Sequence, residues 1–90
     1  MGKRQYREVA TILSKDKVIE VAITESELMN GDKLFTFSPM RRYKDQNGDE
    51  QRTPWLYQRH IASLMEVLPQ VEERLRIEHE KALASKRALR

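Results

Sequence analysis

The chain has 90 residues, of which 39% are hydrophobic and 34% charged, with a formal net charge of +3 and no cysteine. This length and composition are typical of one small globular domain, and they exclude disulfide bonds and thiolate metal sites. No apolar run approaches the roughly 18 residues of a membrane-spanning helix, and the first residues lack the apolar core of a secretory signal, so we expect an intracellular protein with no membrane partner.

Basic residues are concentrated in three parts of the chain. Positive charge exceeds negative charge in residues 1–17, 33–59 and 81–90, whereas residues 18–32 and 60–80 are acidic. Clusters of this kind are either solvated surface or the contact face for a polyanion. The distribution therefore favours a polyanionic partner, with a solvated surface as the alternative.

The first part of the chain predicts two β-strands. Residues 6–14 are moderately β-prone but lack a clean alternation of apolar and polar side chains. Residues 17–24 place Ile19, Val21 and Ile23 on one face at period two, which is the pattern of a strand with one buried face.

Residues 33–44 and 49–57 predict the third and fourth strands. The pair Asn47-Gly48 between them is typical of a tight hairpin turn in which both central residues have positive φ. Pro39 and Pro54 cannot donate a hydrogen bond to a neighbouring strand, so each indicates a sheet edge or an interruption. The predicted helix-facing side of the sheet holds Ile19, Val21, Ile23, Phe35, Phe37 and Leu56. The predicted opposite side holds Glu20, Thr36, Ser38, Arg42, Thr53, Trp55 and Tyr57.

A helix is predicted for residues 59–85, because the apolar spacing there changes from two to three and four. Pro69 removes one hydrogen bond and clashes with the carbonyl of Met65, so the helix should kink or break there. The apolar stripe of this helix, either core or dimer interface, comprises Ile61, Leu64, Met65, Leu68, Val71 and Leu75.

The predicted fold class is therefore α+β, with a four-stranded antiparallel β-meander followed by a C-terminal helix. We expect a single domain over residues 1–90. It consists of a short basic arm at residues 1–5, the sheet at residues 6–57, the helical region, and a basic tail at residues 86–90.

The hairpin formed by the third and fourth strands interleaves basic and aromatic side chains. Binding to a single nucleic-acid strand requires this combination, because cations neutralise phosphates and ring faces stack on bases. Rings in such positions can equally be core or edge packing, and Tyr43 falls by parity with the core residues. The candidate nucleic-acid-binding residues are Lys17, Lys33, Arg41, Arg42, Tyr43, Lys44, Arg52, Trp55 and Tyr57.

The stretch Arg42–Leu56 with its glycine-containing turn, followed by Gln58–Leu64, resembles the positive-cofactor-four family of single-stranded-DNA-binding transcriptional coactivators, including its bacterial and phage members. The resemblance implies a sheet and helix that dimerise through the helices and hold unpaired DNA on their ribbons. By position, Tyr43 falls where the family has a base-stacking aromatic residue, and Arg52 where it has basic residues after the turn. Residues 53–55, Thr-Pro-Trp, depart from the family's small and basic residues.

No motif in the sequence supports catalysis, a metal site or a cofactor. Residues 78–80, Glu-His-Glu, point in different directions on a helix, and residues 45–49 lack the closing glutamate of a calcium loop. We therefore expect a non-enzymatic, largely sequence-independent single-stranded-DNA-binding homodimer that serves transcription, replication or recombination together with proteins of those processes. RNA is a variant of the same hypothesis, because no reader of the 2′-hydroxyl is evident. The alternative is an adaptor that docks a partner protein on its C-terminal amphipathic helix.

Overall fold

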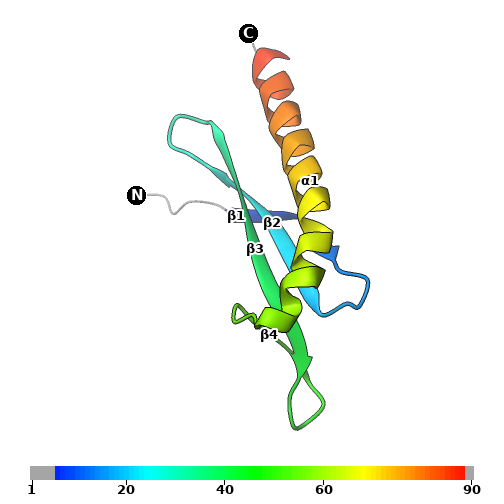
Figure 1. The fold of residues 1–90 in the computed structure, drawn as a ribbon. Helices are drawn as coiled ribbons and strands as arrows, with labels where there is room; N and C mark the ends of the chain where they lie inside the picture. Colours follow the sequence, from blue (N-terminus) through cyan, green and yellow to red (C-terminus); the bar gives the residue numbers. More distant parts are fainter. Residues whose placement is uncertain (1–5, 89–90) are drawn as a thin grey trace.

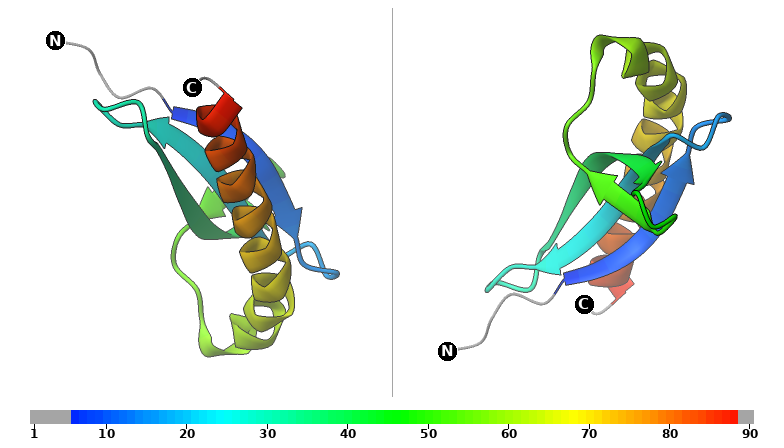
Figure 2. Two further views of the ribbon diagram at one scale, coloured as in Figure 1. Left: turned by 90° about the horizontal axis from the view of Figure 1, so that it is seen from above. Right: turned by 90° about the horizontal axis from the view of Figure 1, so that it is seen from below.

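The computed structural model describes residues 6–88 as a four-stranded sheet with one long helix across a single face (Figures 1 and 2). All neighbouring strands are antiparallel and follow the order β1-β2-β3-β4, which confirms the predicted meander and its following helix. The predicted basic arm, residues 1–5, and the end of the predicted tail, residues 89–90, lie outside the described residues. The elements are β1 (Tyr6–Leu13), β2 (Ile19–Glu27), β3 (Lys33–Lys44), β4 (Glu50–Thr53), the 3-10 turn η1 (Gln58–His60) and α1 (Ile61–Ala88).

The core lies between β2 and the middle of α1. Ile19, Val21 and Ile23 are fully buried, as their period-two spacing predicted, and they meet Val67 and Val71 of the helix. Partly buried side chains that complete this layer include Val9, Ala10, Ile12, Val18, Leu56, Leu64 and Leu75. The core is small, so much of the remaining apolar surface is exposed on a single chain.

A β-bulge explains why β1 lacks regular alternation in the sequence. Glu8 is paired with Thr24 and Ala10 with Ile23, which leaves Val9 without a partner in the ladder. The carbonyl of Val9 accepts a hydrogen bond of 3.3 Å from the guanidinium of Arg74 on α1. The helix therefore satisfies the backbone group that the bulge removes from the sheet.

The prediction that Phe35 and Phe37 belong to the core is only partly right. Phe37 is paired with Ile23 and thus lies on the helix-facing side, yet 47% of its surface is exposed, and Phe35 is half-buried. One helix about 10 Å wide cannot cover four strands spaced about 4.8 Å apart. The part of β3 that carries these rings is therefore left partly uncovered.

The edge position predicted for Pro39 is confirmed. The amide of Arg42 donates to the carbonyl of Val18 (2.7 Å), so even-numbered residues of β3 direct their backbone groups toward β2. The nitrogen of Pro39 consequently points to the other side, where β4 pairs only with residues 41–44. The missing amide hydrogen of this proline therefore removes no hydrogen bond within the sheet.

The fourth strand is shorter than predicted, and this changes the facing of three residues. β4 ends at Thr53 because Pro54 cannot continue the ladder, so Trp55 and Tyr57 lie in the loop before α1. Thr53 is paired with Arg41 and lies on the helix-facing side rather than on the opposite one. The predicted placement of Thr53, Trp55 and Tyr57 beside Arg42 is therefore wrong.

The hairpin between β3 and β4 forms where predicted, but its turn type differs. Gly48 has φ of +83°, whereas Asn47 does not have positive φ. The carboxylate of Asp45 accepts hydrogen bonds from the amides of Asn47 (2.9 Å) and Asp49 (3.0 Å), and this holds a three-residue loop. Only one left-handed residue is required in such a loop.

The helix does not break at Pro69. A 3-10 turn leads into α1, which continues through the proline to Ala88. Met65, whose carbonyl loses its partner, is 64% exposed, so water can hydrate that group. Val67 and Val71 are buried on either side and fix both halves of the helix to the sheet. No helix within residues 6–88 is long and apolar enough to cross a membrane.

Candidate nucleic-acid interface

Two tyrosines and two arginines form a cluster at the junction of β3 and the loop before α1. The guanidinium carbon of Arg41 lies 5.2 Å from the ring centre of Tyr43 and 5.0 Å from that of Tyr57. The guanidinium of Arg59 lies 5.1 Å from the Tyr57 ring. These are cation–π distances, and both rings keep about half of their surface exposed. We call these four residues the aromatic–arginine cluster.

The cluster forms for two reasons: alternate residues of a strand share one side of the sheet, and β4 ends early. Arg41 and Tyr43 lie two residues apart on the helix-facing side of β3, and the chain leaves β4 at Pro54 to cross toward α1. The Nε of Arg41 donates to the carbonyl of Trp55 (3.2 Å), which holds the crossing loop against β3. Tyr57 is thereby placed with its ring centre 5.0 Å from the Arg41 guanidinium.

His60 fixes the end of this loop. The amide of Tyr57 donates to Nδ1 of His60 (3.0 Å), and the two rings lie 5.6 Å apart between centres. His60 is buried, and this burial, reinforced by the charges of Arg59 and Arg41, lowers the pKa of its imidazole below the ordinary 6.5. The neutral imidazole thus caps the first turn of the helical region, a role that was not predicted from the sequence.

Trp55 is the most exposed ring near the cluster. Its surface is 75% exposed, and its backbone is held at the amide by Thr53 Oγ1 (3.3 Å) and at the carbonyl by Arg41. A pocket of about 190 Å³ lies beside it, lined by Leu56, Tyr57, Gln58, His60, Ile61 and Leu64. The helix-facing side of the ribbon thus offers exposed rings, guanidinium groups and a shallow apolar surface together.

Arg42 and Arg52, by contrast, lie on the opposite side of the sheet and are paired with carboxylates. The Nε of Arg42 donates to Glu50 (2.6 Å), and the Nε of Arg52 donates to Glu20 (2.6 Å). Arg42 lowers the pKa of the Glu50 carboxyl through their hydrogen bond and its charge. The sheet separates these two predicted phosphate ligands from the cluster, and acidic groups partly neutralise them.

The three predicted lysines are spread over the molecule. Lys44 is exposed at the ribbon tip, and Lys17 lies in the β1–β2 turn with φ of +63°, where its carbonyl accepts from Arg42 (3.3 Å). Lys33 is at the opposite end of β3, roughly 26 Å along the strand from Arg41. The structure therefore does not bring Lys33 into the site.

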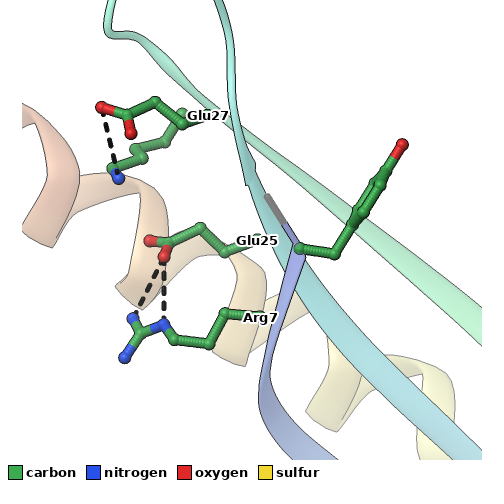
Figure 3. A pocket seen from close by; sticks show the side chains of 5 residues that line it. Arg7, Glu25 and Glu27 are labelled. Carbon is green, nitrogen blue, oxygen red and sulfur yellow. Dashed lines mark hydrogen bonds and ion pairs between the residues drawn. The ribbon is translucent and has the colours of Figure 1, made fainter. Parts of the chain in front are cut away.

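Lys33 instead borders a polar pocket of about 290 Å³ (Figure 3). It forms an ion pair with Glu27 (3.8 Å), while Arg7 and Glu25 point toward one another and pair at 3.1 Å. Two internal ion pairs leave this pocket with little net charge. It does not extend the cluster.

The predicted dimer stripe is divided by the structure. Leu64, Val71 and Leu75 pack against the sheet of their own chain. The exposed fractions of Ile61, Met65 and Leu68 are 52%, 64% and 36%. The side of the helix that covers the sheet includes Val67, which the predicted stripe omits. Only half of the predicted dimer residues are therefore available to another molecule.

Within the part of the chain that the structure describes, no three His, Asp or Glu side chains are grouped so that they could hold a metal ion. Comparison with known proteins finds no matching family model, no matching curated protein and no matching solved structure.

Proposed function

We propose that this protein binds single-stranded DNA on the helix-facing side of the β3–β4 ribbon, without enzymatic activity and with little sequence preference. The observation that carries the proposal is the Arg41 guanidinium lying within cation–π distance of the exposed rings of both Tyr43 and Tyr57. A neighbouring Trp55 and a second arginine, Arg59, extend this surface. Cations interleaved with ring faces suit a strand whose phosphates and bases are both accessible.

The charge environment supports this side of the sheet over the other. Among the described side chains, Arg41 and Arg59 have no carboxylate at ion-pairing distance, whereas Arg42 and Arg52 are paired with Glu50 and Glu20. A phosphate that reaches the cluster gains a cation without displacing an acidic side chain. On the opposite side it would compete with hydrogen-bonded carboxylates.

The exposed aromatic rings give the surface a preference for single-stranded over double-stranded DNA. Each base that stacks on an exposed aromatic ring contributes roughly 1–3 kcal/mol, and every base has a face that can do so. Bases of a duplex are already stacked on their neighbours and present only their edges in the grooves. The surface therefore prefers a single strand and discriminates weakly between sequences.

The test is a titration of the full chain with a fluorescently labelled single-stranded DNA oligonucleotide, followed by anisotropy and by the fluorescence of Trp55. Binding should perturb the emission of Trp55, and its affinity should fall as salt increases because phosphate contacts release counterions. A duplex of the same sequence should bind more weakly. Binding that is absent, or tighter to the duplex, would overturn the proposal.

A uridine oligonucleotide of the same length tests the RNA variant of this proposal. Ring stacking and phosphate contacts do not distinguish the two sugars, so equal affinities would assign the site to single-stranded nucleic acid in general. Transcription, replication and recombination all expose single-stranded DNA. We therefore place the proposed activity in one of these three processes.

A second candidate function is supported by the exposed residues Ile61, Met65 and Leu68, which lie one helical turn apart on α1. Apolar stripes of this spacing dock partner proteins, so α1 is the surface on which a protein adaptor would act. Met65→Lys would abolish capture of such a partner and leave binding to the oligonucleotide unchanged. The same variant would weaken oligonucleotide binding only if α1 lined the nucleic-acid site.

A further inference from the structure

We infer that the outer edge of β3, from Lys33 to Met40, pairs antiparallel with the same edge of a second copy of this chain. The surface lies outside the aromatic–arginine cluster, so the inference is independent of the proposed function. It concerns the long part of β3 that β4 does not accompany (Figures 1 and 2).

This edge presents unpaired backbone groups to the outside. Because even-numbered residues of β3 bond to β2, the amides and carbonyls of Phe35 and Phe37 point outward, as does the carbonyl of Pro39. No other strand within residues 6–88 is paired with β3 along residues 33–40. Such a row of donors and acceptors is a template for an added strand.

The other edge of the sheet is protected in a way that this edge is not. The bulge at Val9 disrupts β1, and Arg74 of α1 already occupies the carbonyl that the bulge leaves. On β3, the usual protective residues, a lysine and a proline, stand only at the two ends of the open segment, Lys33 and Pro39. The residues between them form a regular extended strand with no bulge in its pairing to β2.

The open segment is self-complementary, and this identifies the second copy as the occupant. When Thr36 lies opposite Thr36 of the second copy, Phe35 lies opposite Phe37 and exchanges both backbone hydrogen bonds with it. The amide of Lys33 in one copy then donates to the carbonyl of Pro39 in the other. Because proline has no amide hydrogen, the return hydrogen bond is missing, so the pairing loses one hydrogen bond at each end of the paired segment. Registers centred closer to Arg41 are blocked because β4 occupies that part of the edge.

Side chains along the edge favour the same arrangement. Leu34 is 42% exposed on the side away from α1, and Phe37 is 47% exposed on the helix-facing side. Pairing of the edges would cover apolar groups on both sides of the sheet at once. Within residues 6–88 the core has only five buried hydrophobic residues, and so small a core gains most from such cover.

The β3 edge is better suited than α1 to be the contact with the second copy. Three of the six residues in the predicted helix stripe are already used inside the chain, and the exposed ones offer no backbone hydrogen bonds to fix a register. The β3 edge offers both apolar area and directional hydrogen bonds.

Antiparallel pairing of the two edges has its two-fold axis perpendicular to the sheet. Both helices and both aromatic–arginine clusters would therefore lie on one side of an eight-stranded sheet.

The experiment measures molecular mass in solution for the full chain and for Thr36→Lys. The wild type should have twice the chain mass of 10.7 kDa. In Thr36→Lys, two lysines face each other across the two-fold axis, and the dimer dissociation constant should rise roughly 100-fold or more. Thr11→Lys is the matched control, because it makes the same change on the same side of the sheet in the other edge strand, and it should remain dimeric.

A charge-reversed pair separates lost pairing from lost folding. Thr36→Glu should also be monomeric, and an equimolar mixture with Thr36→Lys should form a heterodimer because opposite charges then meet at the axis. Hydrogen exchange provides a second readout, since the amides of Phe35 and Phe37 should be protected in the wild type and exposed in either variant.

Three outcomes would overturn the inference. The first is a wild type that stays monomeric, and the second is a Thr36→Lys variant that stays dimeric. The third is a dimer that dissociates on Met65→Lys but not on Thr36→Lys, which would assign the contact to α1. None of these results depends on whether an oligonucleotide binds, so they are distinguishable from failure of the proposed function.

Discussion

The guanidinium of Arg41 lies 5.0 Å from the centre of the Tyr57 ring, although the two residues belong to different elements and lie sixteen positions apart in the chain. A hydrogen bond from Arg41 to the carbonyl of Trp55 fixes this relationship. Arg41 thus has two roles, because it holds the loop in place and presents a cation close to two aromatic rings. Substitution of Arg41 and of Trp55 separates the contribution of the charge from that of the rings.

Replacing Arg41 by alanine should weaken oligonucleotide binding roughly tenfold and reduce the slope of log K against log salt by about one, because one phosphate contact is lost. Arg52→Ala is the matched control, since that side chain lies on the other side of the sheet and is hydrogen-bonded to Glu20. It should leave both quantities nearly unchanged. Equal losses from the two variants would place the phosphate path elsewhere on the ribbon.

Replacing Trp55 by alanine should cost roughly 1–3 kcal/mol of binding free energy, and the cost should be similar at low and high salt because stacking carries no net charge. Anisotropy of a labelled oligonucleotide measures it without the tryptophan signal. Tyr6→Ala removes another exposed ring, on β1, and should have no effect. A salt-dependent loss in Trp55→Ala would instead show that the loop positions the arginines.

Acidification should destabilise the fold through His60. Its folded-state pKa is lowered, so the unfolded chain binds the proton more readily, and the free energy of unfolding should fall as pH decreases from about 6.5 through the folded-state pKa. Urea unfolding at several pH values measures this. The slope should diminish in His60→Ala and persist in His79→Ala, where an exposed histidine is removed. A slope that survives in His60→Ala would assign the effect to other groups.

Replacing Pro69 by alanine should raise the free energy of unfolding by roughly 1–3 kcal/mol, because it restores the amide donor for the Met65 carbonyl and removes the clash of the ring. Urea unfolding measures the change. Gln70→Ala alters the neighbouring exposed position and should shift stability by only a few tenths of a kcal/mol. A loss of stability in Pro69→Ala would mean that the proline sets a backbone geometry on which the packing of Val67 and Val71 depends.

Much of the fold follows from local patterns. The period-two spacing of Ile19, Val21 and Ile23 correctly identified the buried face of the sheet, because in a strand alternate side chains point to the same side. The glycine-containing turns and the change to helical spacing gave the order of the elements. The bulge at Val9, the unbroken helix at Pro69 and the exposed Phe37 could not be predicted, because each depends on what packs against the residue.

In the candidate site too, some features follow from the sequence and others depend on tertiary packing. Its residue types are evident in the sequence, and four of the predicted positions, Arg41, Tyr43, Trp55 and Tyr57, lie close together on or beside the ribbon. Which of the arginines are paired with carboxylates was decided by strands that are distant in the sequence, as in the contact between Arg52 and Glu20. The capping role of His60 likewise depends on the loop that brings the Tyr57 amide to its ring.

The sequence by itself determined that a basic and aromatic hairpin would be part of an antiparallel sheet followed by a helix, since composition and periodicity are local properties of the chain. Only the tertiary structure decided which side of that hairpin keeps its charge available. Arg41 and Arg42 are adjacent in the sequence, yet the first lies close to two aromatic rings and the second is paired with Glu50. The reason is physical: adjacent residues of a strand point to opposite sides, and the surroundings of each side are supplied by the rest of the fold.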